Sequence, residues 1–244
     1  MRILVYNIAY GTGSPLGAWE MAAGVRNYIR TPERYFDAIK RMVRRCRADA
    51  AGFLEVDGGS FRTRGKSQLQ ELTEALDAER MPARSKYAPD SPLNHLPYWR
   101  WQTNALLVRS GLSQQQKVDF MPCGTKRLIL ECKVQDIDIL LVHLALGRGV
   151  RRKQLEYLTA LVQNRKRCIV CGDFNTFGGS RELTDFFNNT GFESANKKHS
   201  ATYPARQPVM ELDYILYSPD LDLKSFRIVQ FPGSDHLPLL ADFN

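Results

Sequence analysis

The segment Ile169-Val170-Cys171-Gly172-Asp173-Phe174-Asn175 is the most informative stretch of the chain. Its apolar start followed by polar residues is typical of a buried strand that ends at a site. In an extended chain, residues two apart project to the same face, so we expect the Asp173 carboxylate and the Asn175 amide to meet one substrate oxygen or metal together. Gly, Asp and Asn are also ordinary turn formers, so the segment alone fits a simple turn equally well.

A second polar segment, Gly233-Ser234-Asp235-His236-Leu237-Pro238-Leu239, precedes a closing apolar strand. The adjacent Asp235 and His236 would place a metal ligand beside a base that titrates near neutrality. The alternative is a polar turn before an edge strand, because loops often carry such residues.

Two oxygen-bearing side chains interrupt or end other predicted strands. Glu55 follows the apolar Ala51-Gly52-Phe53-Leu54, and Asn7 interrupts the otherwise apolar first strand. A carboxylate at a strand end is a suitable Mg²⁺ ligand, since Mg²⁺ takes hard oxygen donors. Either residue could instead only terminate its strand.

Two further polar residues lie inside apolar strands. His143 stands within Ile139-Leu140-Leu141-Val142-His143-Leu144, where a lone histidine is more often a satisfied core residue than a catalyst. Asp213 interrupts Leu212-Asp213-Tyr214-Ile215-Leu216 and would need a partner if buried.

Length and composition predict one domain over residues 1–244, because 244 residues that are 43% hydrophobic can bury one large core. The longest apolar stretches are broken by polar residues such as Asp138 and His143, so we expect no transmembrane helix. The first residues, Met1-Arg2-Ile3-Leu4-Val5-Tyr6-Asn7, become polar too soon for a signal peptide, and we therefore expect a cytoplasmic location.

The charge and the cysteines add weaker constraints. A formal net charge of +8 and a pI of about 9.3 favour acidic partners. The five cysteines show no disulfide framework, and Cys168 and Cys171 lie three apart in a predicted strand. Such residues face opposite sides, so we interpret them as buried thiols rather than a metal pair.

The periodicity predicts two packed sheets flanked by helices. Helical patterns occur near residues 32–46, 67–76, 150–164 and 181–188. Predicted strands occupy residues 2–8, 51–54, 105–108, 127–133, 137–144, 168–171, 212–217 and the C-terminal stretch. The short connection Gln135-Asp136 suits a hairpin.

Taken together, the polar motifs resemble those of the endonuclease/exonuclease/phosphatase superfamily. Members of that superfamily have a first strand bearing Asn, a strand ending in Glu, a Thr-His-Leu-like strand, Gly-Asp-Phe-Asn, Leu-Asp-Tyr-Ile and Ser-Asp-His, in this order. The corresponding segments here are Tyr6-Asn7-Ile8, Leu54-Glu55, Val142-His143-Leu144, Gly172-Asp173-Phe174-Asn175, Leu212-Asp213-Tyr214-Ile215 and Ser234-Asp235-His236. The resemblance implies an α/β fold, a four-layer α-β-β-α sandwich of two packed, mixed, mainly antiparallel sheets.

The resemblance also implies roles for individual residues of a metal-dependent phosphoric ester hydrolase. Glu55 and Asp235, with Asn7 nearby, would hold Mg²⁺, for which Mn²⁺ can substitute. Asp213 would orient His236 as general base, and Asp173 with Asn175 would position water and phosphate. Some relatives are argued to use the Asp as base, so the choice between His236 and Asp173 stays open.

His143 separates branches of the superfamily. Abasic-site endonucleases lack this histidine, whereas deoxyribonuclease-like, sphingomyelinase-like and phosphoinositide phosphatase members have it. The resemblance implies that it stabilises the phosphoryl transition state or protonates the leaving oxygen. Two departures stand out: Val142 replaces the usual Thr, and segment 10–31, with Trp19, Met21 and Tyr28, has no counterpart in the motifs.

For the substrate, we expect nucleic acid, cleaved by an endo- or exonuclease reaction. A basic rim would follow the phosphate backbone; it comprises Arg62, Arg64, Lys66, Arg100, Arg148, Arg151 and Arg152. Asn104 would contribute to substrate binding, and Trp99 with Trp101 would form a stacking platform if extended, although they could equally anchor a loop.

Two alternatives remain at this stage. The same chemistry cleaves phospholipid headgroups, so a sphingomyelinase-like lipid or small-molecule phosphodiesterase, or a phosphatase, is the second hypothesis. A catalytically inactive binding module is disfavoured, because every motif keeps its chemically competent residue.

Overall fold

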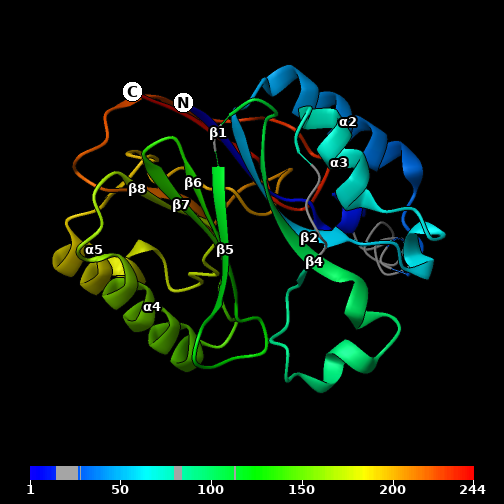
Figure 1. Cartoon of the computed structure of the whole chain (residues 1–244), viewed down its shortest axis with the longest axis horizontal. Coiled ribbons are helices and arrows are strands. Elements are labelled where there is room, and N and C mark those ends of the chain that lie inside the picture. The colour runs from blue at the N-terminus through cyan, green and yellow to red at the C-terminus, as the bar shows by residue number, and fades with distance from the viewer. Residues whose placement is uncertain (15–26, 28, 80–83, 113) are drawn as a thin grey trace.

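The computed structural model describes residues 1–14, 27, 29–79, 84–112 and 114–244, and its twelve named strands form two six-stranded sheets (Figure 1). The first sheet has the order β11-β12-β1-β2-β4-β3, with bounds Leu223–Ile228, Leu239–Phe243, Arg2–Asn7, Ala50–Asp57, Gln102–Val108 and Arg84–Ser85. The second has the order β5-β6-β7-β8-β10-β9, with bounds Gln114–Phe120, Leu128–Val134, Ile137–His143, Cys168–Asp173, Asp213–Tyr217 and Glu193–Ser194.

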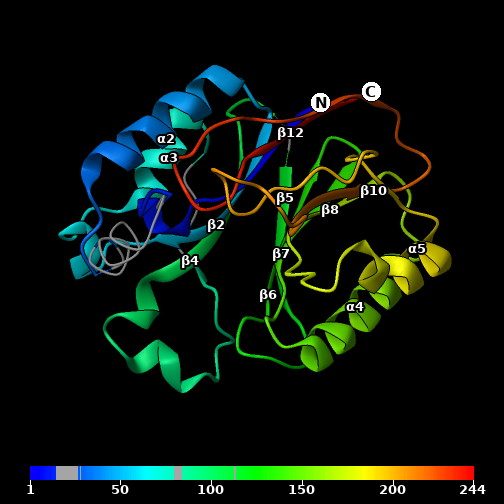
Figure 2. The same ribbon diagram turned by 180° about the vertical axis from the view of Figure 1, so that it is seen from behind.

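The two sheets pack face to face between two layers of helices (Figures 1 and 2). Helices α2 (Glu33–Cys46) and α3 (Gln68–Leu76) cover the outer face of the first sheet, and α4 (Arg148–Val162) and α5 (Thr184–Thr190) cover that of the second. Both sheets mix parallel and antiparallel pairs, with antiparallel pairs in the majority. The predicted four-layer sandwich is confirmed.

Alternating side chains divide the core into three layers. In β1, Ile3 and Val5 join the cluster between the sheets, whereas Leu4 and Tyr6 face the helices. The two strand cysteines behave in the same way, since Cys171 lies between the sheets and Cys168 faces α4 and α5. Both are buried free thiols, which confirms the prediction made from their spacing.

Helix boundaries follow local signals. Phe36, Ile39 and Val43 form the buried face of α2, which ends where Arg47 adopts a left-handed conformation. Ser67 caps α3 by accepting a hydrogen bond from the backbone N–H of Gln70. Within the described residues, no helix is both long and apolar enough to cross a membrane.

The edge strands were the elements that periodicity missed. β5 is polar at its start, with three glutamines and Lys117, and β11 has the mixed sequence Leu-Lys-Ser-Phe-Arg-Ile. Each pairs with only one neighbour, so one side of each strand faces solvent and the apolar signal is weak.

Strand register brings the polar motifs to one edge of the sandwich. Asp213 and His143 both pair with Asp173 across β8, which lies between β10 and β7. The backbones of β7 and β8 approach closely at Gly172, which has a φ of 135°. A Cβ at this position would lie 1.9 Å from the carbonyl oxygen of Val142. The glycine before Asp173 is therefore required by backbone packing.

Candidate active site

Asp173 is the centre of the buried polar cluster. Its Oδ2 accepts a hydrogen bond from Asn7 Nδ2 at 3.1 Å and lies 3.5 Å from His143 Nε2. Its Oδ1 accepts from the backbone N–H of Asn175 at 3.0 Å. Only 2% of the side chain is exposed. The two sheets thus meet at this carboxylate, since Asn7 comes from the first sheet and His143 from the second.

A second carboxylate orients His236. The Nδ1 atom of His236 lies 2.8 Å from Asp213 Oδ2, which also accepts the hydroxyl hydrogen bond of Thr202 at 2.6 Å. This leaves Nε2 directed at Asp173 Oδ2, 3.9 Å away. The ring of Tyr203 packs against the imidazole with 4.9 Å between ring centroids. Asp213, His236 and Asp173 therefore form a connected relay.

The charges within this relay shift two pKa values. Burial alone would lower the pKa of His236, but the carboxylates of Asp213 and Asp173 outweigh it and raise the pKa to about 10. Burial raises the pKa of Asp173 to about 7, against the pull of the His236 charge and with a contribution from Asp213. Both shifts favour the protonated form, so His236 and Asp173 keep their protons to higher pH than the isolated groups would.

Glu55 lies at a break in β2, where the pairing with β4 shifts register. Its φ of 54° is unusual for a non-glycine residue, and its backbone N–H donates to Asn104 Oδ1 at 3.2 Å. The carboxylate lies 3.6 Å from Lys86 Nζ and 3.4 Å from Lys126 Nζ. Although burial works against ionisation, these ammonium groups hold the pKa of Glu55 well below its usual range.

Asp235 lies within electrostatic range of Glu55. Burial raises the pKa of Asp235, and the negative charge of Glu55 raises it further, although the His236 charge opposes both. Ser234 fixes the segment by donating to the backbone oxygen of Asn7 at 2.7 Å. Two partly buried carboxylates that repel each other, together with the amide oxygen of Asn7, are a donor set that fits a hard divalent cation.

A second group could also be considered for a metal, because one ligand atom each from Asp173, Asp213 and His236 lies within 4.8 Å of the others. However, Asp213 Oδ2 and His236 Nδ1 already bond to each other. We therefore interpret this acidic and histidine cluster as the proton relay, and the oxygens of Glu55, Asp235 and Asn7 as the better cation ligands.

Family membership follows from the sequence as a whole. The model of the Endonuclease/Exonuclease/phosphatase family matches residues 4–236. The chain belongs to this family. Members of this family are phosphoesterases, so the protein is a phosphoric ester hydrolase by family. The sequence has no significant match among curated proteins.

Solved structures of this family share the fold. A mannosyl-6-phosphatase of Bacteroides thetaiotaomicron matches with a TM-score of 0.70 and 14% identity, covering 100% of this chain and 99% of that one. The human Nocturnin catalytic domain, with bound sulfate, matches at 0.66 and 22%, covering 100% and 93%. ANGEL2, a 2′,3′-cyclic phosphatase in complex with adenosine-2′,3′-vanadate, matches at 0.62 and 15%, covering 99% and 94%.

The family strand motifs meet at one edge of the sandwich, but the prediction that Asn175 continues the extended chain beside Asp173 is wrong. Asn175 is not in extended chain, since its φ is 51° and β8 ends at Asp173. Its amide nitrogen donates to the backbone oxygen of Leu144 at 2.9 Å, so that side chain fastens the turn after the strand. Asn104 likewise supports the backbone of Glu55 through its side-chain oxygen.

The expected tryptophan platform is also wrong. Trp99 and Trp101 belong to the 3-10 helix Trp99–Trp101, where residues two apart lie on different faces. Trp99 is 39% exposed and packs edge-on against Tyr98, whereas Trp101 lies against Gly58. The packing of Trp101 agrees with the alternative interpretation, in which the tryptophans anchor a loop.

The basic rim is smaller than predicted. Arg62 is buried and stacks on Tyr10, 3.7 Å from its ring centre. Arg151 is buried and forms a two-pronged ion pair with Glu182. The guanidinium groups of these two arginines make contacts inside the protein. They therefore stabilise loops and do not belong to the exposed basic rim. The other rim residues are at least partly exposed, and they are Arg64, Lys66, Arg100, Arg148 and Arg152.

Three contributors to the site were not singled out as functional from the sequence: Lys86, Lys126 and Thr202. Lysines are common in this chain, and nothing in their local sequence separates these two from the exposed ones. Thr202 stands in Thr202-Tyr203-Pro204, a segment that none of the six motifs includes. Trp19, Met21 and Tyr28 of segment 10–31 lie outside the described residues.

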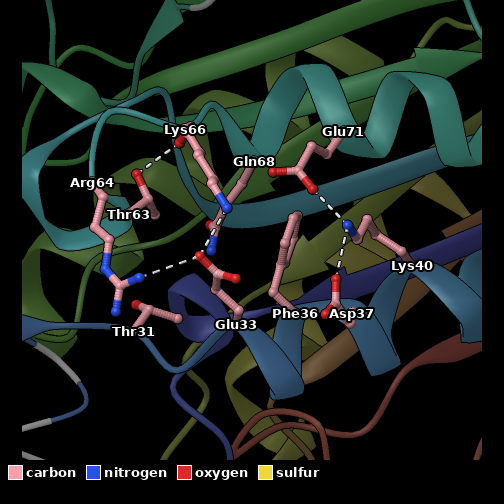
Figure 3. A pocket seen from close by; sticks show the side chains of 10 residues that line it. All are labelled: Thr31, Glu33, Phe36, Asp37, Lys40, Thr63, Arg64, Lys66, Gln68 and Glu71. Atoms are coloured by element: carbon pink, nitrogen blue, oxygen red, sulfur yellow. Dashed lines mark hydrogen bonds and ion pairs between the residues drawn. The ribbon is translucent and has the colours of Figure 1, made fainter.

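A separate hollow lies between α2 and α3, with a volume of about 140 Å³ (Figure 3). Charged side chains on its walls pair with one another. Lys40 contacts Asp37 at 2.9 Å and Glu71 at 2.5 Å, and Lys66 contacts Glu33 at 2.8 Å. We refer to this hollow as the α2–α3 pocket.

Proposed function

We propose that the protein is a divalent-metal-dependent phosphodiesterase that hydrolyses nucleic acid by in-line attack of water. The observation that carries the proposal is the convergence of two sets of groups at one edge of the sandwich. One set offers oxygen ligands with little exposure to water, Glu55, Asp235 and Asn7, and the other is the relay formed by Asp173, His236 and Asp213.

Glu55, Asp235 and Asn7 would hold the cation, Mg²⁺ or Mn²⁺. When bound, this ion would offset the negative charge that develops on a phosphoryl oxygen during hydrolysis. The two carboxylates provide charge, and the Asn7 amide links this half of the site to Asp173 by donating through Nδ2. The Asn104 side chain fixes the backbone of Glu55 and thus the direction of its carboxylate.

The relay would accept the proton of the attacking water. His236 Nε2 and Asp173 Oδ2 lie 3.9 Å apart, so a water between this pair and the phosphate would pass its proton to whichever of the two atoms is unprotonated. Asp213 holds the imidazole through Nδ1, and Thr202 holds Asp213. We therefore assign water activation to the Asp173–His236 pair.

The substrate assignment rests on charge. The formal net charge of +8 attracts a polyanion. Arg64, Lys66, Arg100, Arg148 and Arg152 are exposed and could contact phosphates, although Arg64 and Lys66 pair with Glu33 and Arg152 pairs with Glu156 in the free protein. ANGEL2, which has a similar fold, is a 2′,3′-cyclic phosphatase bound to a nucleotide analogue.

A phosphatase is the second candidate. Two ammonium groups beside Glu55 add positive charge that would suit the extra negative charge of a phosphomonoester. The similar fold of a mannosyl-6-phosphatase is consistent with this candidate.

A substrate panel tests both candidates. With Mg²⁺, purified protein is assayed against single- and double-stranded DNA, RNA, abasic DNA, sphingomyelin, phosphoinositides, bis-p-nitrophenyl phosphate and p-nitrophenyl phosphate. We expect cleavage of a nucleic acid and of the generic diester. Turnover confined to monoesters supports the phosphatase, turnover confined to sphingomyelin supports the lipid alternative, and no turnover of any substrate contradicts the proposal.

A further inference from the structure

Lys126 contacts two residues of the site although no motif includes it. Its Nζ lies 2.7 Å from His143 Nε2 and 3.4 Å from Glu55 Oε1. The lysine side chain is 21% exposed, whereas that of His143 is 2% exposed. Lys126 thus stands between the buried histidine and the solvent-accessible side of the site, where a substrate must approach.

The loop that carries Lys126 is rigidly anchored. Gln154 of α4 is fully buried, and its Nε2 donates to the backbone oxygens of Cys123 at 2.9 Å and Lys126 at 3.1 Å. The backbone N–H of Met121 closes the same loop on Arg127 O at 2.8 Å. These bonds hold the backbone of Lys126, and the contacts to His143 and Glu55 direct its ammonium group, so the charge is placed before a substrate binds.

The direction of the Lys126–His143 hydrogen bond determines which group can face a phosphate. An ammonium group has three N–H donors and no acceptor, so Lys126 donates and His143 Nε2 accepts. The imidazole proton then lies on Nδ1, which is buried and has no hydrogen-bond partner among the described residues. The preceding residue, Val142, has no hydroxyl to offer. His143 consequently has no N–H at Nε2 to present to a phosphoryl oxygen.

Lys86 differs from Lys126 in this respect. Its side chain is only 3% exposed, and its Nζ donates to the Tyr10 hydroxyl at 2.5 Å and lies 3.6 Å from Glu55. Lys86 therefore supports Glu55 from inside the protein. Lys126 has one N–H directed to His143 and one near Glu55, which leaves a third for an oxygen entering from solvent.

We propose that Lys126 is a catalytic residue that donates a hydrogen bond to a non-bridging oxygen of the transferred phosphoryl group, and that His143 is a positioning residue that holds the Lys126 ammonium. This inference rests on the proposed phosphoester hydrolysis. No proton is transferred to or from Lys126, since its charge and its N–H stabilise the negative charge that develops on the oxygen.

The first experiment compares Lys126→Met with Lys133→Met, an exposed lysine on β6 that serves as the matched control. With Mg²⁺, we expect Lys126→Met to lower kcat/KM for bis-p-nitrophenyl phosphate by about 100-fold or more, and Lys133→Met to leave it unchanged. The same loss is expected for a diester with a poor leaving group, because a non-bridging oxygen is contacted in both. Wild-type kcat/KM in Lys126→Met overturns the proposal.

The second experiment tests whether His143 acts through Lys126. If it does, His143→Ala combined with Lys126→Met loses no more activity than Lys126→Met alone, since neighbouring groups that act as a unit are not additive. Losses that multiply in the double variant overturn the positioning role of His143. Thermal melting of each variant verifies folding, and Lys126→Gln replaces Lys126→Met if the latter does not fold.

The third experiment measures binding rather than turnover and so separates this inference from the proposed function. Inorganic phosphate is titrated by calorimetry in the presence of Mg²⁺. Because a charged hydrogen bond is lost, we expect Lys126→Met to raise the Kd for phosphate by about tenfold and Lys133→Met to leave it unchanged. An unchanged Kd in Lys126→Met contradicts the contact. If no substrate is turned over but this shift is observed, the proposed function fails while the phosphate contact stands.

Discussion

The strand-end cluster around Asp173 and the α2–α3 pocket are both rich in charge, but their charges are arranged differently. In the pocket, each charged group has an opposite neighbour, as in the pair Lys66–Glu33, and the side chains of that pair are more than half exposed (Figure 3). In the cluster, the carboxylates of Asp173, Asp213 and Asp235 lie near other negative charges and have little exposure to water. Like charges therefore repel each other there with little screening.

This difference separates structural from chemical use of charge. Exposed pairs contribute little to stability, because water screens them. Buried like charges destabilise the fold and shift pKa values, which a protein retains mainly where catalysis or ion binding requires it. The strand-end cluster is therefore the place to look for chemistry.

The largest effect is expected from removing the cation. Excess chelator should abolish hydrolysis, and added Mg²⁺ or Mn²⁺ should restore it, because Glu55, Asp235 and Asn7 offer oxygen rather than sulfur ligands. Initial rates with bis-p-nitrophenyl phosphate measure this. Full turnover in excess chelator would show that Glu55, Asp235 and Asn7 do not hold a cation needed for hydrolysis.

The next largest effect concerns the relay. Asp173→Ala and His236→Ala should each lower kcat by at least ~100-fold, the usual scale for a positioned acid or base. Steady-state kinetics on folded variants measure the loss. A folded Asp173→Ala protein with near-normal kcat would show that the centre of the cluster is not the reaction centre.

A smaller loss is expected from the support of the relay. Thr202→Val keeps the shape but removes the hydroxyl that donates to Asp213, so His236 is held less firmly. We expect kcat to fall by about tenfold, in line with one neutral-to-charged hydrogen bond. Equal kcat in Thr202→Val and the wild type would mean that Asp213 needs no support beyond His236.

The smallest effect is expected in the α2–α3 pocket. Lys40→Ala removes contacts to Asp37 and Glu71, and should lower the free energy of unfolding by no more than about 1 kcal/mol while leaving kcat unchanged. Chemical denaturation and the diester assay measure the two quantities. A large loss of activity would contradict the structural interpretation of this region.

Much of the fold was predictable because it depends on local pattern. The helix at α2 follows from the spacing of Phe36, Ile39 and Val43, and the central strands follow from apolar runs. The edge strands β5 and β11 were not predictable in this way, since each is polar on the side that faces solvent. Pairing partners, rather than composition, make them strands.

The sequence by itself determined the family and the residues of the strand-end motifs, because Asn7, Glu55, Asp173, Asp213 and His236 each interrupt or end an apolar run that must be buried. Only the tertiary structure decided which groups surround them. It turned Asn175 and Trp99 away from their expected arrangement and brought Lys126, a residue without any local signal, against His143. The alternation of side chains along a strand depends only on local sequence, so it can be predicted. The position of a loop lysine depends on how distant segments pack, so it cannot.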